Sequence, residues 1–444
     1  MKAVCYTLSF LNANGADPMG YLRLVAPLRE AGIQMISGVE GSKIHPEYVS
    51  LGDIVVIQRH FPIHFQEYCK VIEQARIEQK PVVFELDDYL FFLPEIHHDR
   101  LTHTFTPSLL PMFQAVLEAD VITVPTIELK KLLSPFNRNI VVLPNYLDDH
   151  LWYLKQPDDR SSAGEKTVIG YMGTHSHKPD VEMIVPALLE ILNRYDRKVE
   201  ISFWGTQPPD EMRDLTQVNW NPWYFYSYQD FAEYFQTQRV DLFIAPLVDN
   251  VFNRCKSPLK FLEYSALGVC GIYSAIPPYC DIITHKKEGL LASSVEEWKE
   301  SLQTLIENRN MRQELAINAQ RLIRQKYFLS ENAYRWAKAY RKIIENHQNT
   351  TARRTSMLFP VINSINLQLT ELLRENEATL QELRNQVSMK DATVQELTRQ
   401  VDTLRSQLSD YEEEILYYVM SRSWRYTRPL RRLNKSISRL FEQS

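Results

Sequence analysis

The segment NRCKSPLKFLEYSALG, residues 253–268, combines cations, the start of a helix and one carboxylate. Arg254 and Lys256 stand directly before Ser257, and Glu263 follows six residues after that serine. The start of a helix presents unpaired backbone N–H groups and the positive end of the helix dipole to an anion. The segment therefore predicts a phosphate site, and the carboxylate of Glu263 is placed to accept hydrogen bonds from a hydroxylated group attached to that phosphate.

The ends of this helix are also predicted from residue types. Ser257 suits the N-cap, Pro258 the first helical position and Gly268 the left-handed residue after a helix, which gives a helix from about Pro258 to Leu267. Glu263 could alternatively be an ordinary exposed helix residue. We favour a binding role, because the strand-like run DLFIAPL precedes the segment and should place the helix start at the carboxyl edge of a sheet.

The segment GTHSHKP offers a second set of groups for a phosphate. Gly173 permits close backbone approach at the end of a strand, and Thr174, His175 and Lys178 precede a helix, so they could donate to a diphosphate. His175 and His177 are also close enough in sequence to suggest a metal. No cysteine or acidic cluster of ligand spacing accompanies them, so we expect no metal.

A third group of polar residues lies in the first part of the chain. Asp87 and Asp88 come directly after the buried run PVVFEL, where a carboxylate could orient or deprotonate an acceptor hydroxyl. Adjacent residues leave a strand in opposite directions, so both carboxylates should not face a ligand equally, and a role in a turn or a helix cap is the alternative. Further candidates for contact with an acceptor or a phosphate are Arg59, Gly15 and Gly20.

These residues need two α/β domains to bring them together. Strand-like runs alternate with amphipathic helical patterns, stop at the polar run DDRSSAGE at 158–165, and then resume. We predict two Rossmann-like doubly wound sheets facing a cleft, with an acceptor domain at 1–156 and a donor domain at 165–328. A closing helix at 329–348 should pack toward the first domain.

Apolar residues recur every seven positions within residues 357–420. One seam position holds Leu373, Leu380, Val387, Val394, Val401, Leu408 and Ile415, and the other holds Leu383, Leu397, Leu404, Tyr411 and Tyr418. This pattern predicts a coiled coil of two parallel copies, whose register the polar Asn376 and Lys390 could fix. A long helix packed on its own domain is the alternative.

Residues 421–444 form a basic amphipathic tail with a single acid, Glu442. Its cations are Arg422, Arg425, Arg428, Arg431, Arg432, Lys435 and Arg439, and they alternate with aromatic and aliphatic side chains. Such a tail could lie on an anionic membrane surface. A solvated basic end, or a helix docked on a partner protein, is equally compatible with the pattern.

The composition excludes several classes of protein. A net charge of −5 over 444 residues gives no general attraction to nucleic acid. The five cysteines lack the paired spacing of a zinc site, and their odd number argues against a disulfide framework. No apolar run reaches the roughly 18 residues of a membrane span. We expect a cytoplasmic protein, soluble or bound peripherally to the inner face of the cytoplasmic membrane.

The region from Lys2 to about His347 resembles the GT-B fold glycosyltransferases, family 4 (group 1) in particular. The resemblance is carried together by PNYLD at 144–148, IGYMGTHSHKPD at 169–180, KSPLKFLEYSALG at 256–268 and EGLLA at 288–292. It covers about three quarters of the chain, and the coiled coil with its basic tail is similar to extensions appended to such enzymes.

The resemblance implies that Glu263, as the second glutamate of an E-x7-E pattern, contacts the ribose of a nucleotide. Cys255 stands in place of the first glutamate, which in that family addresses the donor sugar. Asp249 and Asn250, in the loop just before, are the two candidates to substitute for it. The departure at Cys255 leaves the donor sugar and the retaining outcome open.

The resemblance implies transfer of a sugar from a nucleotide-diphosphate sugar to a hydroxyl of a glycan or lipid-linked acceptor, as in bacterial surface polysaccharide or glycoconjugate synthesis. It implies no cofactor and no catalytic metal. A nucleotide-sugar epimerase of the same fold is one alternative, and a catalytically inactive scaffold organised by the coiled coil is another. A dehydrogenase is disfavoured, because no G-x-G-x-x-G follows the first strand.

Overall fold

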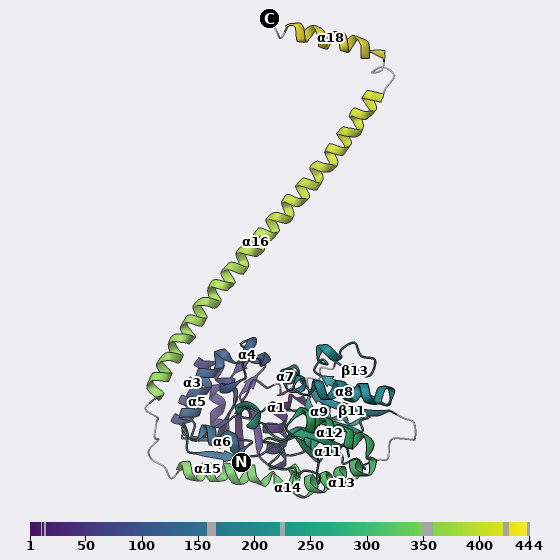
Figure 1. The fold of residues 1–444 in the computed structure, drawn as a ribbon. Coiled ribbons are helices and arrows are strands. Elements are labelled where there is room, and N and C mark those ends of the chain that lie inside the picture. The colour runs from purple at the N-terminus through teal and green to yellow at the C-terminus, as the bar shows by residue number, and fades with distance from the viewer. Residues whose placement is uncertain are drawn as a thin grey trace. The chain divides into compact units, whose positions relative to one another are not determined.

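The computed structural model describes residues 1–9, 11–12, 15–157, 166–222, 227–348, 358–420 and 426–441. The chain divides into two compact units, Met1–Leu367 and Gln368–Ser444. The first unit contains two α/β domains, and the second contains most of one long helix and the tail (Figure 1). The polar run at 158–165, expected to separate the two domains, lies outside the described residues.

The first domain is built on a six-stranded parallel sheet in the order β10-β9-β8-β7-β1-β4. Its strands are β1 (Lys2–Tyr6), β4 (Gln34–Ser37), β7 (Ile54–Gln58), β8 (Val82–Glu85), β9 (Val121–Val124) and β10 (Ile140–Val142). Every residue of β7 and β8 is buried, as expected of strands covered by helices on both faces. Two short antiparallel pairs lie outside this sheet: β2 (Leu11–Asn12) with β3 (Gly15–Ala16), and β5 (Val39–Glu40) with β6 (Lys43–Ile44).

The second domain repeats this architecture in the order β13-β12-β11-β14-β15-β16. Its strands are β11 (Thr167–Gly173), β12 (Val199–Gly205), β13 (Val218–Asn221), β14 (Leu242–Ala245), β15 (Cys270–Ser274) and β16 (Leu290–Ala292), all paired in parallel. In chain order this is the 3-2-1-4-5-6 arrangement of a Rossmann-like sheet, and it reverses direction between β11 and β14. The predicted pair of doubly wound α/β domains is confirmed.

Helices cover both faces of each sheet, because each helix buries its apolar stripe by packing against the sheet. The helices of the first domain are α1 (Pro18–Gly20), η1 (Tyr21–Val25), α2 (Ala26–Glu30), η2 (Pro46–Leu51), η3 (Phe61–Ile63), α3 (Phe65–Ile77), η4 (Leu90–Phe92), α4 (His98–Leu101), α5 (Thr106–Glu118) and α6 (Ile127–Leu133). Those of the second are η5 (His175–His177), α7 (Lys178–Glu182), α8 (Val185–Tyr195), η6 (Asp196–Lys198), η7 (Asp210–Met212), α9 (Tyr228–Gln236), α10 (Val251–Arg254), α11 (Leu259–Ala266), α12 (Val295–Glu307) and α13 (Arg309–Lys326). The five cysteines are all free.

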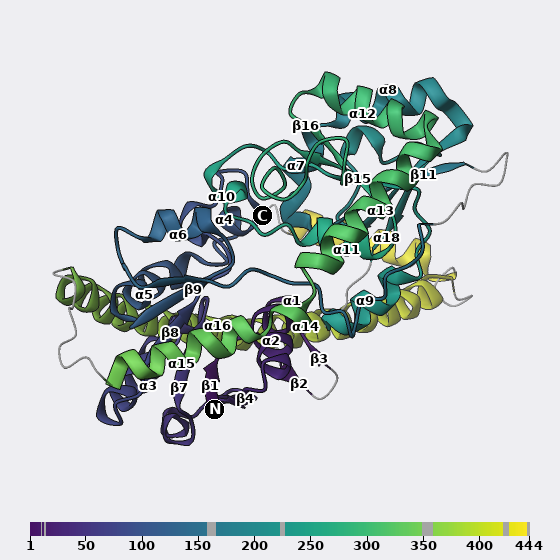
Figure 2. The ribbon, with the colours of Figure 1, turned by 90° about the horizontal axis from the view of Figure 1, so that it is seen from below.

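The chain returns to the first domain through α14 (Leu329–Asn332) and α15 (Tyr334–Gln348). Trp336, Tyr340 and Ile343 of α15 are buried in one apolar cluster with Ala3 and Val56 of the first sheet. Figure 2 shows α15 running along the first domain, next to α2. The end of the chain's α/β part therefore ties the first domain to the second.

The helix α16 (Phe359–Met420) is 62 residues long and is followed by α18 (Arg428–Phe441). Its first turns belong to the compact unit of the α/β domains, where Asn366 donates to Gln114 over 2.8 Å. Along the described ranges, the structure has no helix that combines the length and apolarity needed to cross a membrane.

Candidate functional site

The loops at the carboxyl ends of the two sheets contact each other. Asn145, beyond β10, donates to Ser257 over 2.9 Å, and Thr126, beyond β9, donates to the carbonyl of Cys255 over 2.9 Å. The loops after β11 and β14 flank the point where the second sheet reverses its strand order, which is where open α/β sheets bind ligands. We therefore place the candidate site at this edge of the second sheet.

The helix predicted at 258–267 is α11, Leu259–Ala266, and its start differs from the prediction. Pro258 occupies the N-cap and no side chain caps the helix. Ser257 was expected to be that cap, and the expectation was wrong because its hydroxyl instead accepts the hydrogen bond from Asn145. The predicted left-handed glycine is confirmed: Gly268 has a φ of +70°.

Glu263 is buried on α11 with 1% of its surface exposed. Its Oε1 accepts a hydrogen bond from the hydroxyl of Tyr228 over 2.7 Å, and that hydroxyl also accepts from Trp152. Its Oε2 is buried without a hydrogen-bond partner among the described residues. Burial raises the pKa of Glu263 to about 7, although the bond from Tyr228 opposes the shift. A buried carboxylate oxygen that lacks a donor is costly unless a ligand supplies one.

A cationic group lies one helical turn before Glu263. Lys260 is largely buried, and its Nζ lies 3.5 Å from Nε2 of His177. Burial, and then the charge of the nearby Lys256, lower the pKa of Lys260 to about 8. Burial, followed by Lys260 and Lys256, lowers the pKa of His177 to about 3. The charge of Lys256 disfavours the charged form of Lys260, and a bound anion near both lysines would oppose this effect.

Asp180 fixes the position of His177, the residue that contacts Lys260. Its Oδ2 lies 2.8 Å from Nδ1 of His177, while its Oδ1 accepts from Asn253 over 2.9 Å and from the backbone N–H of Val248 over 2.8 Å. Burial alone would raise the pKa of Asp180, but the contact with His177 prevails and lowers it. The aspartate thus joins the helix that follows β11 to the loop that follows β14.

The other donor candidates are divided between two places. Gly173 ends β11, and Thr174 and His175 follow it at the same edge. Lys178 lies within 4 Å of two carboxylates, Glu182 at 3.6 Å and Asp210 at 3.8 Å.

Arg254 forms a two-bond ion pair with Asp249, at 2.5 and 2.7 Å. Asp249 was one possible substitute for the missing glutamate, and this pair occupies its carboxylate. Asn250, the other, caps α10 by accepting from the backbone of Asn253 over 2.8 Å. Cys255 itself has 1% exposure and packs in the apolar cluster of the first domain with Phe252. Burial raises the pKa of its thiol to about 12.

In the first domain, Arg59 and Asp87 form an ion pair of 3.1 Å beyond β7 and β8. Burial raises the pKa of Asp87 to about 6, against the opposing charge of Arg59. Arg59 has a φ of +45°, a conformation that few residues other than glycine adopt. Asp88 is half-buried, so the two adjacent carboxylates do occupy different environments.

Gly15 and Gly20, the two candidate glycines of the first domain, lie in different elements. Gly20 lies in the helical turn of α1, where its N–H donates to Asp17 over 2.8 Å. That N–H is therefore engaged within the turn and is not free to bind a ligand. Gly15 lies in the short strand β3.

A series of buried polar contacts connects the first sheet to the candidate site. Arg23 pairs with Glu85 at 2.7 Å and donates to Oδ1 of Asn145 over 2.7 Å, and Asn145 in turn donates to Ser257. A buried ion pair needs such additional bonds, because desolvating two charges is costly. This series of contacts links the centre of the first sheet to the segment just before α11.

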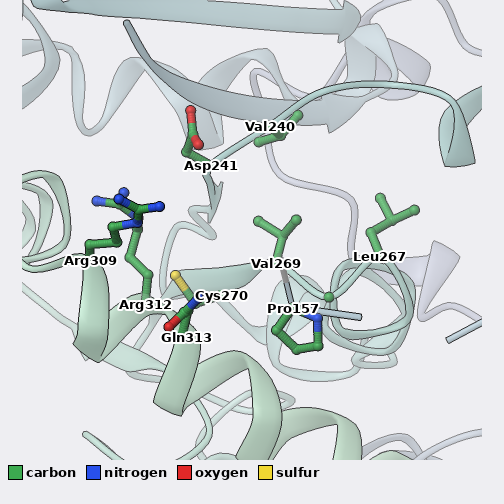
Figure 3. A pocket seen from close by; sticks show the side chains of 10 residues that line it. Pro157, Val240, Asp241, Leu267, Val269, Cys270, Arg309, Arg312 and Gln313 are labelled. Atoms are coloured by element: carbon green, nitrogen blue, oxygen red, sulfur yellow. The ribbon is translucent and has the colours of Figure 1, made fainter. Parts of the chain in front are cut away.

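The pocket in Figure 3 lies at the opposite edge of the second sheet. Val240 and Asp241 precede β14, and Val269 and Cys270 stand at the start of β15. Its volume of about 30 Å³ suits a water molecule rather than a nucleotide. Because parallel sheets bind ligands at their carboxyl ends, we do not assign this pocket to the donor.

Sequence reasoning missed four residues that build the site: Lys260, Asp180, Asn253 and Tyr228. Lys260 lies in the segment from which Lys256 was chosen, and its spacing of four from Lys256 was a usable signal. Tyr228 reaches Glu263 from 35 positions away, and Asp180 reaches Asn253 across 73. No local pattern reveals such contacts.

Residues 166–308 match the family model described as glycosyl transferases group 1. The chain is also similar in fold to the sucrose-phosphate synthase of Thermosynechococcus elongatus, with a TM-score of 0.55 and 13% identity over 78% of this chain and 99% of that one. It is similar to the Anabaena protein HepE, solved in complex with UDP-glucose, with a TM-score of 0.51 and 12% identity over 79% and 100%. No curated protein sequence matches the chain.

These similarities agree with the observed architecture, in which two α/β domains contact each other through the loops at the carboxyl ends of their sheets. The fold is of the GT-B type, and the second domain carries the sequence pattern of group 1 glycosyltransferases. The resemblance noted in the sequence is confirmed at this level.

Proposed function

We propose that the protein transfers a sugar from a nucleotide-diphosphate sugar to an acceptor hydroxyl. The observation that carries the proposal is the buried, unpartnered Oε2 of Glu263, one helical turn beyond Lys260. A carboxylate and a pair of cations at this spacing match the ribose hydroxyls and the diphosphate of one nucleotide. The site lies where the second sheet reverses its strand order, which suits a nucleotide.

The leaving diphosphate would bind between Lys256, Lys260 and the backbone of the loop Gly173–His175. As the glycosidic bond breaks, negative charge grows on the diphosphate, and cations fixed in place stabilise that charge most effectively. His177 and Asp180 would orient Lys260 rather than touch the sugar. These lysines supply the charge that a metal supplies elsewhere, so we propose transfer without a catalytic metal and without a cofactor.

The acceptor would approach from the first domain. Asp87 and Asp88 follow β8, and Thr126 and Asn145, at the same edge of the first sheet, contact Cys255 and Ser257 in the segment before α11. Asp87, with its raised pKa, is the candidate to orient or deprotonate the acceptor hydroxyl, and Arg59 holds its carboxylate. Closure of the two domains would limit hydrolysis of the donor.

HepE binds UDP-glucose according to its structure, and UDP-sugars are therefore the first donors to test on this chain. The acceptor would be a glycan or a lipid-linked sugar, in bacterial surface polysaccharide or glycoconjugate synthesis.

Turnover is the direct test of this function. Purified protein with UDP-sugars and a panel of glycan acceptors should release UDP and form a glycoside. Asp87→Asn should lower turnover at least about 100-fold with little change in nucleotide binding, as expected for a lost proton acceptor. Equal UDP release by the variant would remove Asp87 from the mechanism.

Two other functions remain distinguishable in the same assay. An epimerase would convert the donor sugar with no acceptor present, so product analysis with donor alone identifies it. A scaffold is favoured by one observation, the burial of Cys255 where a donor-binding glutamate is expected. It would give neither product, and binding of the nucleotide without turnover would then support the scaffold.

We also propose that α16 pairs with a second copy of the chain. Its heptad positions are exposed in the single chain, from 46% at Val401 to 63% at Leu404. Two such seams would bury each other. The paired helices would hold two donor and two acceptor domains in one assembly.

The tail is proposed to bind an anionic membrane surface on the cytoplasmic side. Leu430 and Leu433 on α18 are exposed, at 69% and 65%. The predicted cations Arg422 and Arg425 and the acid Glu442 lie outside the described residues. The full chain should float with phosphatidylserine vesicles, and a chain that ends at Val419 should not. Equal flotation of the two chains would contradict membrane binding by the tail.

A further inference from the structure

Three metal-ligating side chains from the two domains meet beside the candidate site. His98 and Asp99 belong to α4 of the first domain, and His175 belongs to η5 of the second. One ligand atom from each lies within 4.8 Å of the other two. The imidazole rings of His98 and His175 approach to 4.1 Å between centroids, at 74°.

The two imidazoles are otherwise unused. Among the described residues, no hydrogen bond or ion pair is formed by a ring nitrogen of His98 or His175. His177, the other histidine of the loop, contrasts with them: Asp180 contacts one of its nitrogens and Lys260 the other. The structure therefore assigns His175, and not His177, to the junction with the first domain.

Asp99 is held by its own neighbours. Its backbone N–H donates to Nδ1 of His97 over 3.2 Å, and the ring of His97 packs edge-on against Phe252 of the second domain, 5.2 Å between centroids. His97, the residue before the first metal ligand, therefore packs across the junction between the two domains. The carboxylate of Asp99 has its own neighbour as well, because its Oδ2 lies 3.8 Å from Nδ1 of His97.

We propose that His98, Asp99 and His175 bind a divalent transition-metal ion that fastens the first domain to the second. Two imidazole nitrogens and one carboxylate oxygen suit zinc, whose bonds to these ligands are about 2.0–2.2 Å. Tetrahedral coordination at that length separates ligand atoms by about 3.4 Å, so the group needs only a small inward movement. Three protein ligands leave a fourth position for water.

The inference goes beyond the proposed function, because the ion would act on the arrangement of the domains and not on the glycosidic bond. A ligand that binds only the closed arrangement stabilises it by mass action. Zinc binding is measured with no nucleotide or acceptor present, so its outcome is independent of whether the protein transfers a sugar.

Zinc titration of the full chain, stripped with a chelator, tests the proposal. We expect one zinc ion per chain with a dissociation constant below about 10 µM, which is about 7 kcal/mol of binding, and a rise in the midpoint of thermal unfolding. His98→Ala and His175→Ala should each weaken binding at least about 30-fold and abolish that rise, as loss of one of three ligands requires.

A matched control is available on the surface of the first domain. His150 lies 3.4 Å from Glu30 and its side chain is 64% exposed, so it pairs an imidazole with a carboxylate but has no second histidine. His150→Ala should leave zinc affinity unchanged. Zinc binding that is absent in the wild type, that keeps the wild-type affinity in either cluster variant, or that is lost in His150→Ala would overturn the proposal.

Discussion

At the scale of single residues, the proposed donor site depends on two groups whose pKa is shifted from its usual value by burial. Glu263 is partly protonated near neutral pH because its pKa is raised to about 7, and Lys260 loses its proton near pH 8. Both groups regain their normal charge if a nucleotide provides hydroxyl donors to one and phosphate charge to the other. Ligand binding should therefore change how many protons the protein holds.

Lys260 gives the clearest prediction of this kind. Its pKa is lowered to about 8 in the free protein, and a bound diphosphate raises it again, so at pH 8 binding of UDP takes up about half a proton through this lysine. The contribution of Lys260 to affinity should be complete below pH 8 and be lost as the pH rises through and above 8, whereas the contribution of Glu263 should be lost as the pH falls below 7. Calorimetry of UDP binding in two buffers with different ionisation enthalpies measures this uptake.

Lys260→Met should abolish the proton uptake and weaken UDP binding about 10- to 100-fold, as expected for a lost charged hydrogen bond. Lys166→Met is the matched control, since Lys166 pairs with Glu200 over 3.1 Å at the amino ends of β11 and β12, away from the candidate site. Unchanged uptake in Lys260→Met would contradict the assignment of the diphosphate to this lysine.

At the scale of elements, Gly268 fixes where α11 ends. Its φ of +70° disfavours any side chain, and a Cβ at this position would lie 2.6 Å from the backbone oxygen of Lys155. Gly268→Ala should therefore lower the free energy of unfolding by about 2 kcal/mol or more, through strain and a backbone clash together. Denaturant unfolding measures the loss.

Gly41→Ala separates the two causes. Gly41 has a φ of +61° with no atom within 4 Å of an added Cβ, so only the backbone strain of about 1 kcal/mol should remain. If the two variants lose the same stability, the contact with Lys155 does not set the end of α11.

The elements were predictable from the sequence to a greater extent than the contacts between them. Alternating strands and helices, the left-handed Gly268 and the cations before α11 all follow from local patterns. The N-cap at Ser257 was wrong because Asn145, 112 positions away, takes its hydroxyl. Lys260 and Asp180 were missed for the same reason, since burial and partners across the sheet give them their roles.

At the scale of the whole molecule, the exposed seams of α16 predict a dimer. Light scattering after size exclusion should give about twice the chain mass of 52.1 kDa. Leu397→Lys with Leu404→Lys places charge in the seam and should give the monomer mass. Thr403→Lys with Ser406→Lys adds the same charge outside the seam and should leave the dimer intact. A monomeric wild type would remove self-association from the account.

The central claim is that α11 opens a nucleotide-diphosphate site closed by Glu263. Calorimetric titration of the full chain with UDP tests it most directly, with Glu263→Ala beside the wild type and Glu118→Gln as a control. Glu118 is a buried glutamate that also accepts from a tyrosine, Tyr68, over 2.8 Å, but it lies in the first domain. We predict saturable binding that Glu263→Ala weakens about 10- to 100-fold and Glu118→Gln preserves. Equal UDP affinity in the wild type and Glu263→Ala, with both proteins folded, would contradict the claim.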